Sequence, residues 1–343
     1  MRIDPLNPKL QQHLAGIALC AAVATAAIEL SQWAPLAHFG LGALTLAIVL
    51  GIALGNLAPA ALHQRTAAGI MFSQRTLLRL GVALYGVRLT LQQVSSVGLT
   101  GIVTDVLVIA STLAVGLWIG TRWLKLDRDT ALLIATGSAI CGAAAVMAAE
   151  PVVRAPAHKV AVAVATVTIF GTAAIAIYPL LYPLAGLSSA QFGTYIGSTV
   201  HEVSQVVAAG NAVSPAVADQ AVIIKLIRVL MLAPFLLLIG RLAARGADTA
   251  GARKTPLVPG FVLLFGIVIA VNSLGLIAPS IRSVLLGIDN LLLAVAMAAL
   301  GWSTRVGMLR QAGLRPLLLG AAVFGFLLGG GYAINRAVAL LLS

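Results

Sequence analysis

Eleven apolar stretches, each about 20 residues long, follow one another along the chain. A helix of that length crosses the hydrocarbon core of a bilayer. The stretches are 13–31, 36–55, 68–90, 98–121, 130–149, 158–182, 190–210, 216–240, 257–278, 283–302 and 315–339. Only 9% of the residues are charged and 60% are hydrophobic, which leaves too little charge to cover a soluble protein of this size. The sequence therefore predicts an all-α polytopic membrane protein with about eleven transmembrane helices.

The basic residues indicate how these helices are oriented. The formal charge is +12, and most of it lies in short gaps between apolar stretches. If the N-terminus is cytoplasmic, the cytoplasmic gaps and end carry Arg2, Lys9, Arg65, Arg75, Arg122, Lys125, Arg128, Arg241, Arg245, Arg253, Lys254, Arg305, Arg310 and Arg315. The other side then carries only Arg88, Arg154, Lys159, Arg282 and Arg336. This asymmetry favours a cytoplasmic N-terminus and an odd number of crossings. Nucleic-acid binding is not expected, because no basic domain with interleaved aromatic residues is present.

Internal repeats are indicated by two similar segments. GSAICGAAAVMAA (137–149) aligns with GSTVHEVSQVVAA (197–209) without a gap. A weaker similarity between 51–59 and 266–279 does not share the same offset, so the boundaries of a repeat stay open. We expect residues 1–343 to form a single transmembrane transporter domain, whose core and scaffold subdomains the sequence does not separate.

An ionisable cluster interrupts the stretch 190–210. At 100° per residue, one face of a helix there carries Thr194, Ser198, His201, Glu202 and Gln205. Glu202 would lie about 18 Å from the start of the helix, near the middle of the membrane. A charge there costs at least about 2.5–3.5 kcal/mol, so it is expected to face a cavity or a partner. The alternative is a protonated Glu202 that hydrogen-bonds a neighbouring helix.

Two cations follow in the next stretch. Lys225 and Arg228 are three residues apart and share one helix face. Buried cations require anions, and a substrate anion would meet a planar fork from Arg228 and a point charge from Lys225. The alternative is a static bridge, either Glu202–Lys225 or Asp219–Arg228.

The segment ATGSAICGAAAVMAAEP (135–151) is rich in small residues. Such residues allow close helix packing, and they also suit a broken helix whose exposed N–H groups bind an anion. Ser138, Cys141 and Gly142 are the candidate ligands there. Of the remaining intramembrane polar residues, Asp105 and Asp289 are expected at the interface, near helix ends. Arg88 is expected to anchor a helix at the membrane surface.

Signatures of enzymes and metalloproteins are missing from the sequence. No nucleotide-binding glycine loop is present, and the two cysteines, Cys20 and Cys141, show no metal-ligand spacing. Ser198 lies near His201 but lacks an orienting carboxylate. No catalytic residue, metal or cofactor is therefore expected.

The segments ATGSAICGAAAVMAAEPVV (135–153), GSTVHEVSQVVAAG (197–210) and GVALYGVRLTL (81–91) resemble the YeiH-like family of bacterial inner-membrane proteins, which is named for sulfate export. More distantly, the chain is similar to the bile-acid–sodium symporter and cation–proton antiporter superfamily. This resemblance implies inverted repeats, a core and a scaffold, and broken helices that cross at the centre of the membrane. It also implies that Glu202 and Gln205 belong to an ion site. The double-cysteine, proline-glycine motif of the bile-acid group is absent, which leaves sodium coupling open.

The leading hypothesis is a secondary transporter for a small anion such as sulfate, a sulfonate or a carboxylate, coupled to protons through alternating access. Ser138, Cys141, Gly142, Ser198, Lys225 and Arg228 would bind the substrate, and His201, Glu202 and Gln205 would couple the ion. One alternative is a cation–proton exchanger that uses Glu202 and Asp289. Another is a membrane sensor or enzyme. The expected location is the bacterial inner membrane. The expected partners are the lipid bilayer, the anion and a proton or sodium ion. Whether the protein forms a homodimer is left open.

Overall fold

The computed structural model describes residues 8–32, 42–232, 234–236, 260–305, 307 and 312–342. All regular elements among these residues are helices, and none is a β-strand. Five helical segments are long and apolar enough to cross a membrane: Gln12–Ser31, Leu91–Trp123, His158–Ala185, Pro279–Ser303 and Leu314–Leu342. Two shorter helices, Ala43–Leu57 and Gly260–Ser273, are also apolar. The chain is therefore an all-α polytopic membrane protein, and this prediction is confirmed.

All eleven expected stretches are helical over most of their described residues. The end of the stretch 216–240 and the basic gap at 241–254 lie outside the described residues, as do Arg2 and Arg310. Contacts divide the chain into two compact units. Unit 1 contains Met1–Leu91 and Phe261–Val306, and unit 2 contains Gln92–Gly260 and Gly307–Ser343.

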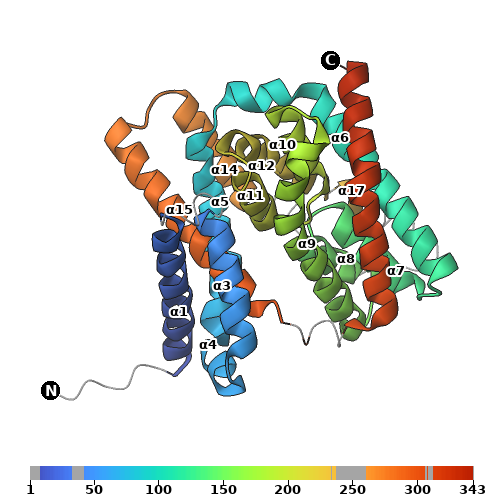
Figure 1. Ribbon diagram of the computed structural model, residues 1–343, viewed down its shortest axis with the longest axis horizontal. Coiled ribbons are helices and arrows are strands. Elements are labelled where there is room, and N and C mark those ends of the chain that lie inside the picture. The colour runs from blue at the N-terminus through green and yellow to red at the C-terminus, as the bar shows by residue number, and fades with distance from the viewer. Residues whose placement is uncertain are drawn as a thin grey trace. The chain divides into compact units, whose positions relative to one another are not determined.

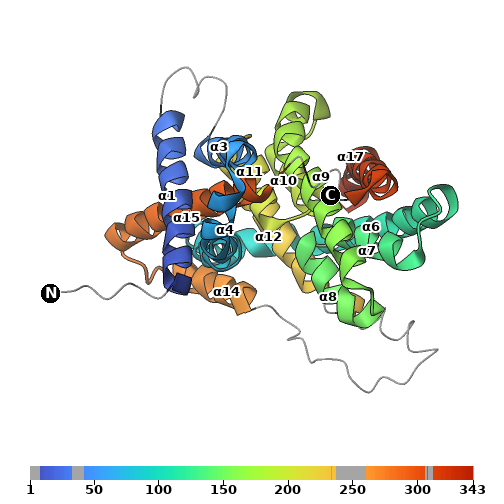
Figure 2. The ribbon, with the colours of Figure 1, turned by 90° about the horizontal axis from the view of Figure 1, so that it is seen from below.

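Unit 1 is a bundle held together by close glycine contacts. Its helices are α1 (Pro8–Ser31), α3 (Ala43–Leu57), α4 (Ala60–Phe72), η1 (Ser73–Leu77), α5 (Leu78–Tyr85), η2 (Gly86–Arg88), α14 (Gly260–Ser273) and α15 (Pro279–Ser303). Helices α1, α3 and α4 lie side by side, and α15 packs against them (Figures 1 and 2). A Cβ at Gly16 would lie 2.7 Å from the Cα of Gly69, so the backbones of α1 and α4 touch without intervening side chains.

A buried ion pair in unit 1 corrects two expectations. The guanidinium of Arg88 donates to Oδ2 of Asp289 from Nε at 2.9 Å and from Nη2 at 2.7 Å. The Asp289 side chain is fully buried, so it does not lie at the interface. Helix α15 begins at Pro279, four residues before the expected start at 283, which places Asp289 about three turns inside the helix. Arg88 is its counter-charge rather than a surface anchor.

Unit 2 contains the segments on which the functional hypothesis rests. Its helices are α6 (Leu91–Trp118), η3 (Ile119–Trp123), α7 (Arg128–Ala139), α8 (Ala143–Val153), α9 (Ala157–Ala185), α10 (Ser189–Thr199), α11 (Val203–Asn211), α12 (Pro215–Leu230) and α17 (Leu314–Leu342). Apolar side chains of α6, α7, α8, α9 and α17 form one buried core. Both long helices α9 and α17 pack against α7, so they frame the broken segment 128–153 (Figure 2).

The stretch 130–149 is a helical hairpin rather than one helix. At the start of α7, Asp127 and Asp129 bind the ammonium of Lys159, at the start of α9, at 2.6 and 3.1 Å. The end of α8 is joined to that same start of α9 by only residues 154–156. Helix α8 therefore returns to the end of the unit from which α7 began. The structure differs here from the expected crossing, and the turn between the arms is residues 140–142.

The stretch 190–210 forms a second hairpin. Near the start of α10, Thr194 Oγ1 accepts a hydrogen bond at 3.1 Å from Gln220, near the start of α12. Helix α11 ends at Asn211, three residues before α12, so both arms have their bases at the same end of the unit. The turn between these arms is residues 200–202.

The two hairpins enter unit 2 from opposite ends. Helix α9 starts beside the base of the first hairpin and ends three residues before the base of the second. Its 29 residues span about 43 Å. The elements α7, α8 and α9 start at 128, 143 and 157, and α10, α11 and α12 start at 189, 203 and 215, a nearly constant offset. The similarity between 137–149 and 197–209 thus corresponds to equivalent parts of the two hairpins, in inverted orientation.

Candidate functional site

The tips of the two hairpins touch in the middle of unit 2. Gly142, at the first tip, has φ +67° and ψ −136°, a conformation that L side chains rarely adopt. A Cβ at this position would lie 2.4 Å from Cγ of Glu202, at the second tip. Glycine is therefore required at 142 both by the backbone and by the close approach of the other hairpin.

Both cations of α12 bind the carbonyl groups at the ends of the first arms. Lys225 Nζ donates to the carbonyl oxygen of Ile140 at 2.7 Å and to that of Val200 at 2.6 Å, so one ammonium joins the two tips. Arg228 donates from Nε to the carbonyl oxygen of Ala139 at 2.7 Å and from Nη1 to that of Ser198. Both side chains are fully buried. The last carbonyls of a helix carry partial negative charge, so two buried cations here offset two helix C-termini.

The carboxylate of Glu202 lies at the opposite kind of helix end. Its Oε1 accepts a hydrogen bond at 3.2 Å from the N–H of Ala143, the first residue of α8. The main-chain N–H of Glu202 donates a hydrogen bond to Oε1 of Gln205 at 3.0 Å. Among the described residues no ion pair joins Glu202 to Lys225. The first hairpin thus has a cation at the end of its first arm and an anion at the start of its second arm, which matches the partial charges of both ends.

Several buried polar atoms around the tips lack hydrogen-bond partners within the described part of the chain. They are Nδ1 of His201, Oγ of Ser204, Nε2 of Gln205 and Oγ1 of Thr136. Buried polar groups in folded proteins are normally paired, so these atoms are candidates to bind water or a ligand. Gln205 reaches α9, where a Cβ at Gly171 would lie 2.2 Å from its Oε1.

Ser198 connects the tips to α17. Its hydroxyl accepts a hydrogen bond at 2.9 Å from Nδ2 of Asn335, which is itself buried. The neighbouring Thr199 hydroxyl accepts from the phenol of Tyr178, on α9, at 2.8 Å. These side-chain bonds hold the last turn of α10 in place between α9 and α17.

Asp105 belongs to this site, although the sequence placed it at the interface. Its side chain is completely buried, and Arg228 and Lys225 are close enough to act on it electrostatically. Neither carboxylate oxygen has a hydrogen-bond partner within the described residues. The backbone is non-helical at Gly98, so Asp105 lies about two turns into the part of α6 that follows this break, on its buried face.

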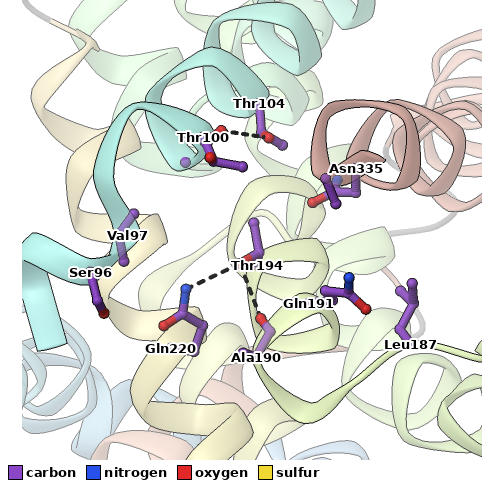
Figure 3. Close-up of a pocket in the computed structure, with 12 residues that line it drawn as sticks. Ser96, Val97, Thr100, Thr104, Leu187, Ala190, Gln191, Thr194, Gln220 and Asn335 are labelled. Carbon is purple, nitrogen blue, oxygen red and sulfur yellow. Dashed lines mark hydrogen bonds between the residues drawn. The ribbon is translucent and has the colours of Figure 1, made fainter. Parts of the chain in front are cut away.

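A pocket of about 200 Å³ opens beside α10. Its wall is formed by residues of α6, α10, α12 and α17 and of the turn before α10, and Figure 3 shows their side chains facing one cavity. The polar members carry only hydroxyl and amide groups: Ser96, Thr100, Thr104, Gln191, Thr194, Gln220 and Asn335. Gly98, in the wall-forming part of α6, has φ +54° and ψ −155°, which breaks the helix locally.

The residues predicted from the sequence to bind substrate or couple an ion lie in the two turns or on α7, α10, α11 and α12. These residues are Ser138, Cys141, Gly142, Ser198, His201, Glu202, Gln205, Lys225 and Arg228. Asn335 and Tyr178 were missed and Asp105 was placed at the interface, because the sequence does not show which helices pack against these residues. Asp289, which the cation–proton alternative pairs with Glu202, lies in unit 1, where its Oδ2 accepts hydrogen bonds from Arg88.

Comparison with known proteins places the sequence in a family. Residues 15–320 match the family described as Conserved hypothetical protein 698. The chain belongs to this family. One relative, a UPF0324 membrane protein of Pasteurella multocida (strain Pm70), is 48% identical over 303 residues. This alignment covers 88% of the chain and 90% of the relative. The UPF0324 inner membrane protein YeiH of Escherichia coli (strain K12) is 46% identical over 332 residues, covering 96% and 95%. The predicted YeiH-like resemblance is confirmed, and no solved structure matches the chain.

Proposed function

We propose that the protein is a secondary active transporter that moves a small anion together with a proton. The observation that carries this proposal is the hydrogen bond between the Glu202 carboxylate and the N–H of Ala143. A helix N-terminus in a water-poor site binds anions, and here an anion of the protein itself holds that position. Broken helices that meet at the membrane centre are the usual setting of substrate sites in secondary transporters.

In this mechanism, a substrate anion takes the place of the Glu202 carboxylate at the N-terminus of α8. Protonation neutralises Glu202 and weakens its hold on the α8 N-terminus. The positive charges of Lys225 and Arg228 remain, so the site then favours an incoming anion. That anion would lie among Ser138, Cys141, Gly142 and Ser198, and Lys225 retains one N–H beyond the two that bind carbonyls. His201 and Gln205, next to Glu202, would pass or stabilise the proton. Sulfate, a sulfonate and a carboxylate all fit this chemistry.

The hairpins also strengthen the proposed orientation. Two re-entrant hairpins reduce the crossings expected from the sequence from eleven to nine, which is still odd. Arg154 and Lys159 then move to the side of the N-terminus, and only Arg88, Arg282 and Arg336 stay opposite. The basic asymmetry therefore increases, which supports a cytoplasmic N-terminus. The relatives named as inner membrane proteins support the same location for this chain.

The test is anion flux into proteoliposomes as a function of the imposed pH gradient. Labelled sulfate and a labelled small carboxylate serve as probes, with labelled sodium as the probe for cation exchange. Glu202→Gln keeps the shape of the side chain but cannot take up a proton, so proton-driven accumulation is expected to disappear while the protein stays folded. Glu150→Gln, on the same helix α8 but at its other end, is the matched control and should behave as wild type. Wild-type pH-dependent flux in Glu202→Gln would exclude the proposal.

A further inference from the structure

Asp105 is a buried carboxylate to which the hairpin tips and their two cations donate no hydrogen bond within the described residues. Both of its oxygens lack hydrogen-bond partners within the described residues, and its side chain has no exposed surface. An ionised carboxylate is costly to bury unless it is hydrogen-bonded as well as paired. The charged groups that act on it are Arg228 and Lys225, both of α12. Those two donate their hydrogen bonds to main-chain carbonyls, so they supply charge to Asp105 without fixing its oxygens.

The pocket beside α10 is lined by residues next to Asp105 on α6, although Asp105 itself is not part of the lining. Thr104 lines the pocket and immediately precedes Asp105, and Gly101 lines it one turn earlier on the same buried face of α6. On the facing side, Asn335 lines the pocket and binds the hydroxyl of Ser198, whose carbonyl accepts from Arg228. Figure 3 shows Thr104 and Asn335 on α6 and α17, with the cavity wall continuing to Thr194 and Gln220.

Seven of the twelve residues that line the pocket are polar and can bind water. Hydroxyl and amide groups can each donate and accept, and the lining residues include no charged side chain that would hold an ion. A cavity of about 200 Å³ has room for several waters, since one occupies about 30 Å³ of liquid. A chain of waters between neutral polar groups is a path along which a proton can move.

We propose that Asp105 is a second proton-binding carboxyl of the transporter, and that the pocket is the water-filled path by which the proton reaches it. Proton uptake by Asp105 removes its negative charge beside Arg228 and leaves that cation bound to the tips alone. The proton comes from water in the pocket and returns there when the carboxyl ionises again. The inference deepens the proposed function, but proton binding by Asp105 is measured without transport.

The first experiment identifies the group that titrates. Purified protein labelled with ¹³C-aspartate is followed by infrared difference spectroscopy between acid and alkaline pH. One C=O band of a protonated aspartic acid is expected in wild type, missing in Asp105→Asn and retained in Asp289→Asn, the matched control for the other buried aspartate. The bands of the aspartates other than these two are expected in all three proteins. A difference spectrum that Asp105→Asn leaves unchanged would overturn the assignment.

The second experiment tests the path. The same band shifts when the carboxyl exchanges its proton for deuterium, so its rate in D₂O reports water access. Thr100→Trp fills the pocket and is expected to slow exchange at least tenfold, and Ala190→Phe fills it from α10 if Thr100→Trp does not fold. Thr121→Trp, exposed on η3, is the control and should exchange at the wild-type rate. Unchanged exchange in the filled variants would exclude this route.

The two proposals can fail separately. If Asp105 titrates while Glu202→Gln transports as wild type, the proposed function fails and the assignment of Asp105 stands. If Asp105 does not titrate while Glu202→Gln is uncoupled, the assignment of Asp105 fails and the proposed function stands.

Discussion

Oε1 of Glu202 accepts a hydrogen bond from the main-chain N–H of Ala143, at 3.2 Å and 59 residues away in sequence. Each residue lies at the tip of its own hairpin, so this bond joins two elements that enter unit 2 from opposite ends. Lys225 makes a second connection, through its bonds to Ile140 and Val200. The two tips are thus held together by Glu202 and Lys225. A proton would neutralise Glu202 and a bound anion would compete for Lys225, so the contact is sensitive to both.

Gly142→Ala is expected to separate the tips. The added Cβ would lie 2.4 Å from Cγ of Glu202, at a φ of +67°. Backbone strain and overpacking together should lower the free energy of unfolding by about 3 kcal/mol, measured by thermal unfolding in detergent. Gly186→Ala is the control, because Gly186 has φ +60° with nothing within 4 Å of a Cβ, so it should cost only about 1 kcal/mol. Equal losses in the two variants would show that the tips do not press on each other.

Arg228→Met is expected to be strongly destabilising, by about 3–5 kcal/mol, because the carbonyls of Ala139 and Ser198 lose their donor and the Asp105 carboxylate loses one of its two cations. Asp105→Asn should recover part of this loss in the double variant, since the unpaired charge is then removed. A double-mutant cycle from thermal unfolding at pH 9 should give a coupling of at least about 1 kcal/mol. Additive losses would place Asp105 outside the influence of Arg228.

Much of this arrangement was predictable from particular residues. Glu202, Lys225 and Arg228 are charges in apolar stretches, and the cost of burying charge predicted that they face a cavity or a partner. The similarity between 137–149 and 197–209 favoured two broken helices that meet at one site. The length of each stretch was also sufficient to predict an all-helical membrane protein.

The hairpins could not be predicted in the same way. A stretch of 20 apolar residues has the same composition whether it crosses the membrane or turns back halfway, so 130–149 and 190–210 were expected to cross. The partners of Lys225 are main-chain carbonyls of Ile140 and Val200, which carry no side-chain signature. The expected start of a helix at 98 agrees with the break at Gly98, but the sequence could not show that the face of α6 carrying Asp105 is buried against other helices.

Lys225→Met is expected to weaken anion binding. It removes the positive charge and the bonds to both tips while keeping the length of the side chain. Hydrogen bonds that involve a charged group contribute about 1.5–3 kcal/mol, so the Kd for sulfate or a small carboxylate should rise at least tenfold. Anion-dependent shifts in unfolding temperature measure this Kd at several concentrations. Lys159→Met removes a lysine at the outer end of the same unit and should leave the Kd unchanged. A Kd that is the same in both variants would remove Lys225 from the anion site.

Asp127 provides a pH-dependent test of the first hairpin's base. Burial tends to raise the pKa of Asp127, but hydrogen bonds from the Lys159 ammonium and from Thr130 outweigh it and lower the pKa to about 2. A carboxyl whose pKa is lowered by folding stabilises the protein above its unfolded pKa of about 4, and this contribution is lost as the pH falls toward 2. The unfolding temperature of wild type should therefore fall across this window.

Asp127→Asn still caps α7 but does not ionise, so its unfolding temperature should be lower than that of wild type at neutral pH and should fall less between pH 4 and pH 2. Asp127→Ala also loses the cap and should be less stable by about a further 1 kcal/mol at every pH. Parallel pH profiles for wild type and Asp127→Asn would show that the contact between Asp127 and Lys159 does not hold the starts of α7 and α9 together.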